Sequence, residues 1–126
     1  MRQARVTATY GLTATLAAGS AVDLYFKFLD RDGQYYVRKA WLIPDIDVAT
    51  NATDYITVGL SIVGGSALVT SRSTAATGLT AGTLEEMTVA TGAVIKYGDV
   101  VKFSVGNAAS GKANRCRIAL ELEQAF

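Results

Sequence analysis

Residues 115–123 read Arg-Cys-Arg-Ile-Ala-Leu-Glu-Leu-Glu, so that cysteine or an aliphatic residue returns at every second position. Successive side chains of a β-strand point to opposite faces of a sheet, and this period of two predicts a strand with one buried face. The expected inward residues are Cys116, Ile118, Leu120 and Leu122. The expected outward residues are Arg115, Arg117, Glu121 and Glu123.

The same alternation recurs along the chain and predicts its fold class. It is clear in residues 6–14, 22–28, 55–62 and 101–105, and mixed in residues 34–43, where Tyr, Val, Leu and Trp fall on both sides. Shorter candidate strands lie at 67–71 and 84–89, whereas residues 74–82 are typical of a loop. Short alternating segments separated by turn residues predict an antiparallel β-sandwich of about eight strands, with jelly-roll-like connections.

The length and composition predict a single domain over residues 1–126, with residues 1–5 a candidate for an extended N-terminal arm. Half of the 126 residues are hydrophobic, which is enough to form a core without covalent staples. The chain has one cysteine, so no internal disulfide can form.

The charge balance argues against nucleic acid and membranes as partners. Twelve basic residues face 11 acidic ones, and a phosphate-binding surface normally needs a clear basic excess. The N-terminus does not resemble a signal peptide, and no segment approaches the roughly 18 apolar residues of a membrane helix. These features predict a soluble protein made in a cytoplasm.

Nucleophilic and metal chemistry lack their usual residues. The chain has no histidine, and a lone Cys116 on a core face cannot build a zinc site or a cysteine–histidine pair. Residues 106–113 approach a P-loop, but Ala113 replaces the hydroxyl residue that holds magnesium, and strands rather than a helix flank the segment. A hairpin loop is the better interpretation.

Acidic residues offer the remaining routes to catalysis or metal binding. Residues 30–33, Asp-Arg-Asp-Gly, begin like a calcium loop without its later ligands, and Asp45 with Asp47 leaves a weak surface calcium site as an alternative. Glycosidase chemistry requires two facing carboxylates, whereas Glu121 and Glu123 suit cross-strand pairing with basic residues. We therefore predict no enzyme activity, and no catalytic, cofactor-binding or metal-binding residues.

The expected outward faces favour a protein partner. Charged residues make up 18% of the chain, and the outward positions are dominated by Thr, Ser, Ala and Tyr. Four large residues have no clear inward position and are interface candidates: Tyr25, Tyr36, Leu42 and Tyr55. A symmetric homo-oligomer is the simplest form of such an interface.

Several phrases of the sequence resemble a viral module. They are Trp-Leu-Ile-Pro-Asp at 41–45, Ala-Thr-Asn-Ala-Thr-Asp-Tyr-Ile-Thr-Val at 49–58, Gly-Leu-Thr-Ala-Gly at 78–82 and the Gly-Asp turn at 98–99. Over residues 20–124 the chain resembles the small jelly-roll decoration (cement or head-stabilising) proteins of tailed bacteriophages. The resemblance implies a non-enzymatic trimer on the capsid exterior that binds the major capsid protein and bridges neighbouring subunits.

Exposure predicts which segments would make those contacts. They are the N-terminus, with Met1 and Arg2, the loop 45–54, with Asn51, and the loop 73–83, with Thr80. An alternative function is a carbohydrate- or receptor-binding module of a tail or head fibre. It would use some of Tyr25, Tyr35, Tyr36, Trp41 and Tyr55 as a stacking platform.

Overall fold

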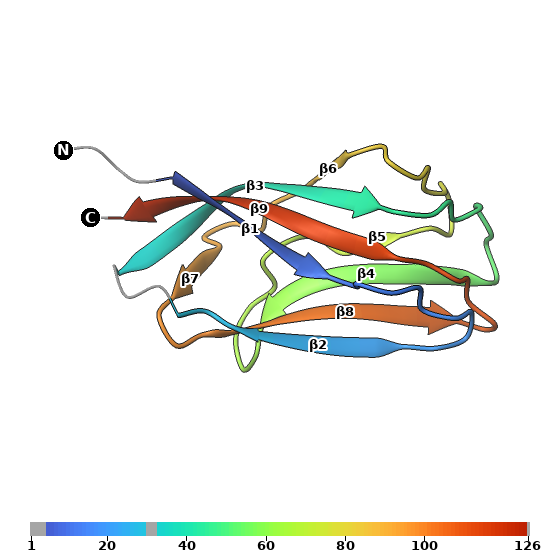
Figure 1. Cartoon of the computed structure of the whole chain (residues 1–126), viewed down its shortest axis with the longest axis horizontal. Coiled ribbons are helices and arrows are strands. Elements are labelled where there is room, and N and C mark those ends of the chain that lie inside the picture. Colours follow the sequence, from blue (N-terminus) through green and yellow to red (C-terminus); the bar gives the residue numbers. More distant parts are fainter. Residues whose placement is uncertain (1–4, 30–32, 126) are drawn as a thin grey trace.

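The computed structural model describes residues 5–29 and 33–125, and within these ranges the regular elements are β-strands (Figure 1). The strands are β1 (Arg5–Gly11), β2 (Val22–Lys27), β3 (Gln34–Pro44), β4 (Tyr55–Ile62), β5 (Arg72–Ser73), β6 (Glu85–Met87), β7 (Val94–Lys96), β8 (Val100–Ala108) and β9 (Cys116–Ala125). No helix long and apolar enough to cross a membrane occurs in the described ranges.

The strands form two antiparallel sheets that lie one above the other (Figure 1). One sheet has the order β1-β9-β3-β6, with β7 also pairing with β3, and the other has the order β2-β8-β4-β5. Each sheet buries one face against the other, which accounts for the period of two along the long strands. The expected all-β sandwich is confirmed.

The pairing pattern is that of a jelly roll. β1 pairs with β9, β2 with β8, β3 with both β6 and β7, and β4 with β5. The outermost strands of the sequence pair first, and each following pair lies farther toward the middle of the sequence. Together the pairs form one long two-stranded antiparallel ribbon. The ribbon wraps so that β9 also meets β3 and β8 also meets β4, which closes the two sheets. Since β6 and β7 both pair with β3, they together take the place of one strand in an eight-stranded jelly roll.

The core lies between β3 and β9 of one sheet and β4 and β8 of the other. Its fully buried side chains include Ile118, Leu120 and Leu122 from β9, as the alternation predicts, and Val101 and Phe103 from β8. Burying an aliphatic or aromatic side chain of this size contributes about 1.5–3 kcal/mol. The two central strand pairs therefore carry much of the stability.

A β-bulge in β3 explains the mixed alternation of residues 34–43. The register with β9 shifts between Val37 and Lys39, so Arg38 is an extra residue in the strand. Tyr35 and Val37 face the core before the bulge, and Ala40 faces it afterwards. The phase of the alternation thus reverses once within the strand.

The bulge corrects the interpretation of Leu42 as a surface residue. Leu42 follows the shifted phase and has no exposed area, so the expectation that it contacts a partner is wrong.

The hairpin strand expected at 67–71 is displaced, because β4 pairs with Arg72 and Ser73 and meets Ala67 only in an isolated bridge. The strand expected within 84–89 is present as β6.

Replacing Leu42 with Ala is expected to lower the free energy of unfolding by about 2–5 kcal/mol, because it opens a cavity in the core. Leu84→Ala is the matched control, since Leu84 is 58% exposed in the loop before β6. Its effect should stay within about 0.5 kcal/mol. Urea unfolding of the two variants measures both values, and equal effects would contradict the bulged register.

Candidate protein-binding surface

Four connections gather at one end of the sandwich, on the right in Figure 1. They are residues 12–21 between β1 and β2, 45–54 between β3 and β4, 74–84 between β5 and β6, and 109–115 between β8 and β9. We call this set the loop end. The jelly-roll topology brings the four together, because antiparallel pairing returns the chain to the same end after each pair of strands.

Backbone hydrogen bonds join loop 45–54 to loop 74–84. Val48 and Leu79 exchange both of their bonds, at N···O distances of 2.9 and 2.8 Å. The amide of Ala81 donates to the carboxylate of Asp47 at 2.7 Å. The contact is so close that a Cβ atom on Gly78 would lie 2.4 Å from the carbonyl oxygen of Val48. These two loops therefore form one rigid layer.

The side chain of Arg72 fastens the same layer to the sheet. Its guanidinium donates to both carboxylate oxygens of Glu85 and to the carbonyls of Thr77 and Gly78, at 2.8 and 3.1 Å for the carbonyls. The planar group can satisfy several acceptors at fixed angles. A half-buried ion pair thus sets the course of loop 74–84.

Loops 12–21 and 109–115 are joined in the same way. Leu16 and Asn114 exchange backbone hydrogen bonds at 2.8 and 3.0 Å. The amide of Ser110 donates at 2.9 Å to the carboxylate of Asp54, which links these loops to loop 45–54. All four connections are consequently held in one arrangement before any partner arrives.

The exposed residues of the loop end are small and uncharged. Two exceptions are Asp47, whose carboxylate accepts the bond from Ala81, and Leu84. The others are Thr13, Ala14, Thr15, Ala17, Ala18, Gly19, Ala21, Ala49, Thr50, Ala52, Thr53, Ala76, Thr77, Thr80, Ala81, Gly82, Thr83, Ala109, Ser110 and Ala113. Small side chains lose little rotamer entropy when they are covered, and uncharged ones avoid a large desolvation penalty. This surface suits burial against another protein.

Two of the expected interface residues lie at the loop end. Asn51 caps a turn there, because its side-chain oxygen accepts from the amides of Thr53 and Asp54 at 2.9 and 2.7 Å. Thr80 is exposed on loop 74–84. Tyr55, which begins β4 directly after loop 45–54, is half-buried beside them.

The other expected interface residues are scattered. Tyr36 lies near the opposite end of β3, half-buried beneath Arg38, whose guanidinium is 4.9 Å from the ring centre and also pairs with Glu123. Tyr25 is 60% exposed on the outer face of β2, in the other sheet. Met1 and Arg2 lie outside the described residues. Sequence reasoning missed loops 12–21 and 109–115, because only the topology places them beside the other two.

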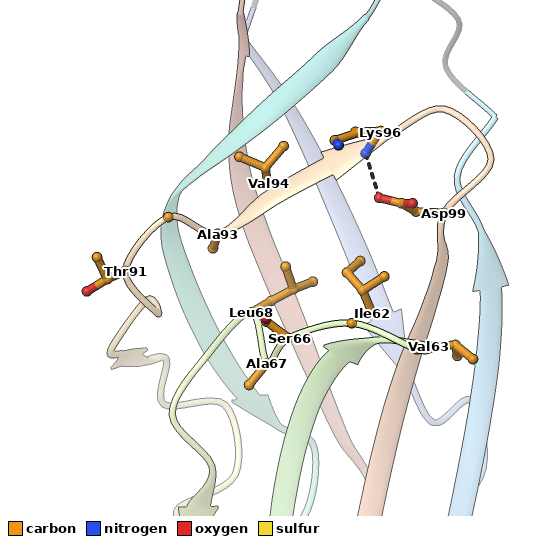
Figure 2. Close-up of a pocket in the computed structure, with 13 residues that line it drawn as sticks. Ile62, Val63, Ser66, Ala67, Leu68, Thr91, Ala93, Val94, Lys96 and Asp99 are labelled. Carbon is orange, nitrogen blue, oxygen red and sulfur yellow. Dashed lines mark hydrogen bonds between the residues drawn. The ribbon is translucent and has the colours of Figure 1, made fainter.

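A cavity of about 390 Å³ opens at the opposite end (Figure 2). It lies between the turn at 62–68 and the segment 91–99, and its lining combines Gly, Ala and aliphatic residues with Ser66, Thr91, Lys96 and Asp99. Its acidic lining residue, Asp99, accepts the amide hydrogen of Lys96 at 2.8 Å and thereby shapes the turn before β8.

Several acidic side chains are engaged in ion pairs. Asp45 accepts from Arg117 at 3.0 and 3.1 Å, and Glu85 and Glu123 pair with Arg72 and Arg38. Among the described residues no three Cys, Asp or Glu side chains group as metal ligands do. The P-loop-like segment 106–113 contains the end of β8 and the connection to β9, and no helix follows it. The hairpin interpretation is wrong, because β8 and β9 belong to different sheets and the segment crosses from one sheet to the other.

The comparisons with known proteins give a distant structural similarity and no sequence match. No protein-family model and no curated protein matches the chain. A chain in the solved structure of infectious bursal disease virus, Gx strain, is similar to it over 98% of its length, with 17% sequence identity and a TM-score of 0.48. The match covers 32% of that viral chain, so the present chain spans about a third of its length.

Replacing Gly78 with Ala is expected to separate loops 45–54 and 74–84, because the added Cβ would collide with the carbonyl of Val48. We expect a loss of about 1–3 kcal/mol in the free energy of unfolding and faster hydrogen exchange at the amides of Val48 and Leu79. Gly106→Ala is the control, since nothing lies within 4 Å of its added Cβ. Unchanged exchange in the Gly78 variant would contradict the rigid layer.

Burial raises the pKa of the Cys116 thiol from 9.0 to about 11, with a smaller contribution from the nearby negative charge of Asp45. The thiol therefore ionises in the unfolded chain at a lower pH than in the folded one. Stability from this group is complete below pH 9 and is lost as the pH rises toward 11, by up to about 3 kcal/mol. Urea unfolding across this range should show a steeper loss in the native chain than in Cys116→Ala, where the Tyr10 hydroxyl, whose pKa burial also raises, still contributes. Parallel profiles would contradict this contribution of Cys116.

Proposed function

We propose that the chain is a non-enzymatic structural protein of a virus particle, and specifically a capsid decoration protein that stabilises neighbouring capsid subunits. In this role it is made in the host cytoplasm, forms a homo-oligomer with a trimer favoured, and binds the major capsid protein on the outside of the capsid. The observation that carries the proposal is the loop end, a preformed surface of small uncharged residues.

The loop end supports a permanent protein contact in two ways. Its loops are already hydrogen-bonded to one another, so little ordering entropy remains to be lost on binding. Its exposed residues carry few charges, so a partner can cover them without stranding ions. A cement protein needs both properties, because it must clamp adjacent subunits with no turnover.

The phrases at 41–45, 49–58 and 78–82 support the same reading from the sequence. They belong to the end of β3, the loop that follows it with the start of β4, and loop 74–84, so much of the matching stretch lies in or beside the loop end. Three of the four phrases that carry the resemblance to phage decoration proteins therefore lie in or beside the loop end, and the fourth, Gly98–Asp99, lies at the opposite end.

The carbohydrate-binding alternative has less support. Tyr35 is buried in the core, and the outward rings of β3, Tyr36 and Trp41, lie beneath Arg38 and Lys39. In the other sheet Tyr25 lies opposite Lys102 and Tyr55 opposite Ala108, six residues farther along β8. A stacking platform requires exposed aromatic rings side by side, and these rings do not form one.

The proposal is tested by mixing the chain with particles of the major capsid protein encoded in the same genome and sedimenting them together. We expect the chain to co-sediment and to raise the temperature at which the particles disassemble. Thr53→Arg and Thr80→Arg should each weaken binding at least tenfold, because each places a charge in the buried contact. Thr91→Arg is the matched control at the opposite end and should bind as the native chain does.

Each contrary result has a distinct meaning. Failure of the native chain to co-sediment would overturn the decoration role. If Thr91→Arg weakens binding while Thr53→Arg and Thr80→Arg do not, the capsid contact lies at the cavity end and not at the loop end.

A further inference from the structure

The strand β2 presents a free edge at the side of its sheet. It is the first strand in the order β2-β8-β4-β5, and within residues 5–29 and 33–125 only β8 pairs with it. An unpaired edge is a template for another strand, and proteins normally shorten it, cover it or use it. β2 is six residues long and lies along the outside of the sandwich in Figure 1.

The outward backbone groups of β2 can be identified from its hydrogen bonds. Phe28, just after the strand, donates its N–H to Asp99 and accepts from Gly98, each at 2.8 Å, so its polar groups face β8. Because these groups alternate along an antiparallel strand, those of Asp23, Tyr25 and Lys27 face the free edge. Their side chains are exposed on the outer face of the sheet.

The sequence of β2 is complementary to itself when it is reversed about Tyr25. Residues 22–28 read Val-Asp-Leu-Tyr-Phe-Lys-Phe. An antiparallel copy with its axis at Tyr25 places Asp23 opposite Lys27 and, by symmetry, Lys27 opposite Asp23. Leu24 then lies opposite Phe26 on the inner face. Opposite charges and aromatic–aliphatic pairs are the favourable cross-strand combinations.

Other axes on this strand lose the match. An axis at Asp23 or at Lys27 places two like charges directly opposite each other, which is destabilising. An axis at Leu24 or Phe26 places Asp23 and Lys27 opposite uncharged residues. The Tyr25 axis also makes Asp23, Tyr25 and Lys27 the hydrogen-bonded positions, which are the residues whose backbone groups face outward.

We propose that two copies of this chain pair through β2, antiparallel and on a two-fold axis at Tyr25. Three hydrogen-bonded residue pairs contribute about six backbone hydrogen bonds. The two small sheets become one continuous sheet, and the half-buried side chains of Val22, Leu24 and Phe26 are covered by their counterparts. A two-fold contact gives an even number of copies: two when it acts alone, or six when it joins two trimers.

Charge reversal tests the proposal on the purified full chain by light scattering and sedimentation velocity over a range of concentrations. The native chain should have the mass of two or six copies. Lys27→Asp places Asp opposite Asp and should raise the dissociation constant at least tenfold, as should Asp23→Lys. The double variant Asp23→Lys/Lys27→Asp restores opposite charges and should associate as the native chain does.

Both positions are exposed, so circular dichroism should show that all three variants keep the fold. A native chain of one or three copies would overturn the pairing, and so would a double variant that stays dissociated. A monomer that still co-sediments with capsids would overturn the pairing alone and leave the proposed function standing.

A cysteine cross-link tests the position of the axis. Cα atoms of a hydrogen-bonded antiparallel pair lie about 5.5 Å apart, within the range that a disulfide spans. Tyr25→Cys should therefore form a covalent dimer under mild oxidation, while the native Cys116 stays buried. Asp23→Cys is the control, because its own counterpart lies about 14 Å away. Equal cross-linking of the two variants, or none in Tyr25→Cys, would overturn the Tyr25 axis.

Discussion

The pairing of β3 with β9 is the contact on which the rest of the structure depends. It joins the two longest strands in a register that runs from Gln34 opposite Ala125 to Pro44 opposite Cys116. β1 pairs with the other side of β9, with Arg5 opposite Glu123, so the first and last strands are neighbours. The inner faces of these strands supply much of the core that the second sheet covers.

The same pairing also positions the loop end. Where β3 ends and β9 begins, the amide of Asp45 donates to the carbonyl of Arg115 at 2.8 Å, and its carboxylate accepts from Arg117. Loop 45–54 therefore leaves the sheet in a fixed direction and meets loop 74–84 through Val48 and Leu79. A surface made of loops is rigid here because its first residues are tied to the central strand pair.

The sequence predicts the long strands well and the short ones poorly. The alternation of β9 predicts its buried face correctly, because a regular strand keeps its phase throughout. β3 does not keep its phase, since the extra residue Arg38 reverses it, and this is why Leu42 was expected at the surface. β5, β6 and β7 have two or three residues each, too few for a period to be recognised.

The candidate surface was predictable only in part, because loops are recognised from sequence whereas their neighbours in space are not. Asn51 and Thr80 were expected at a contact with a partner. That loops 12–21 and 109–115 lie beside them follows from the strand order and could not be predicted from the sequence. Hydrogen exchange of the chain, free and bound to capsid particles, tests the central claim most directly. The account predicts new protection confined to the four connections of the loop end, and protection elsewhere with those loops unchanged would contradict it.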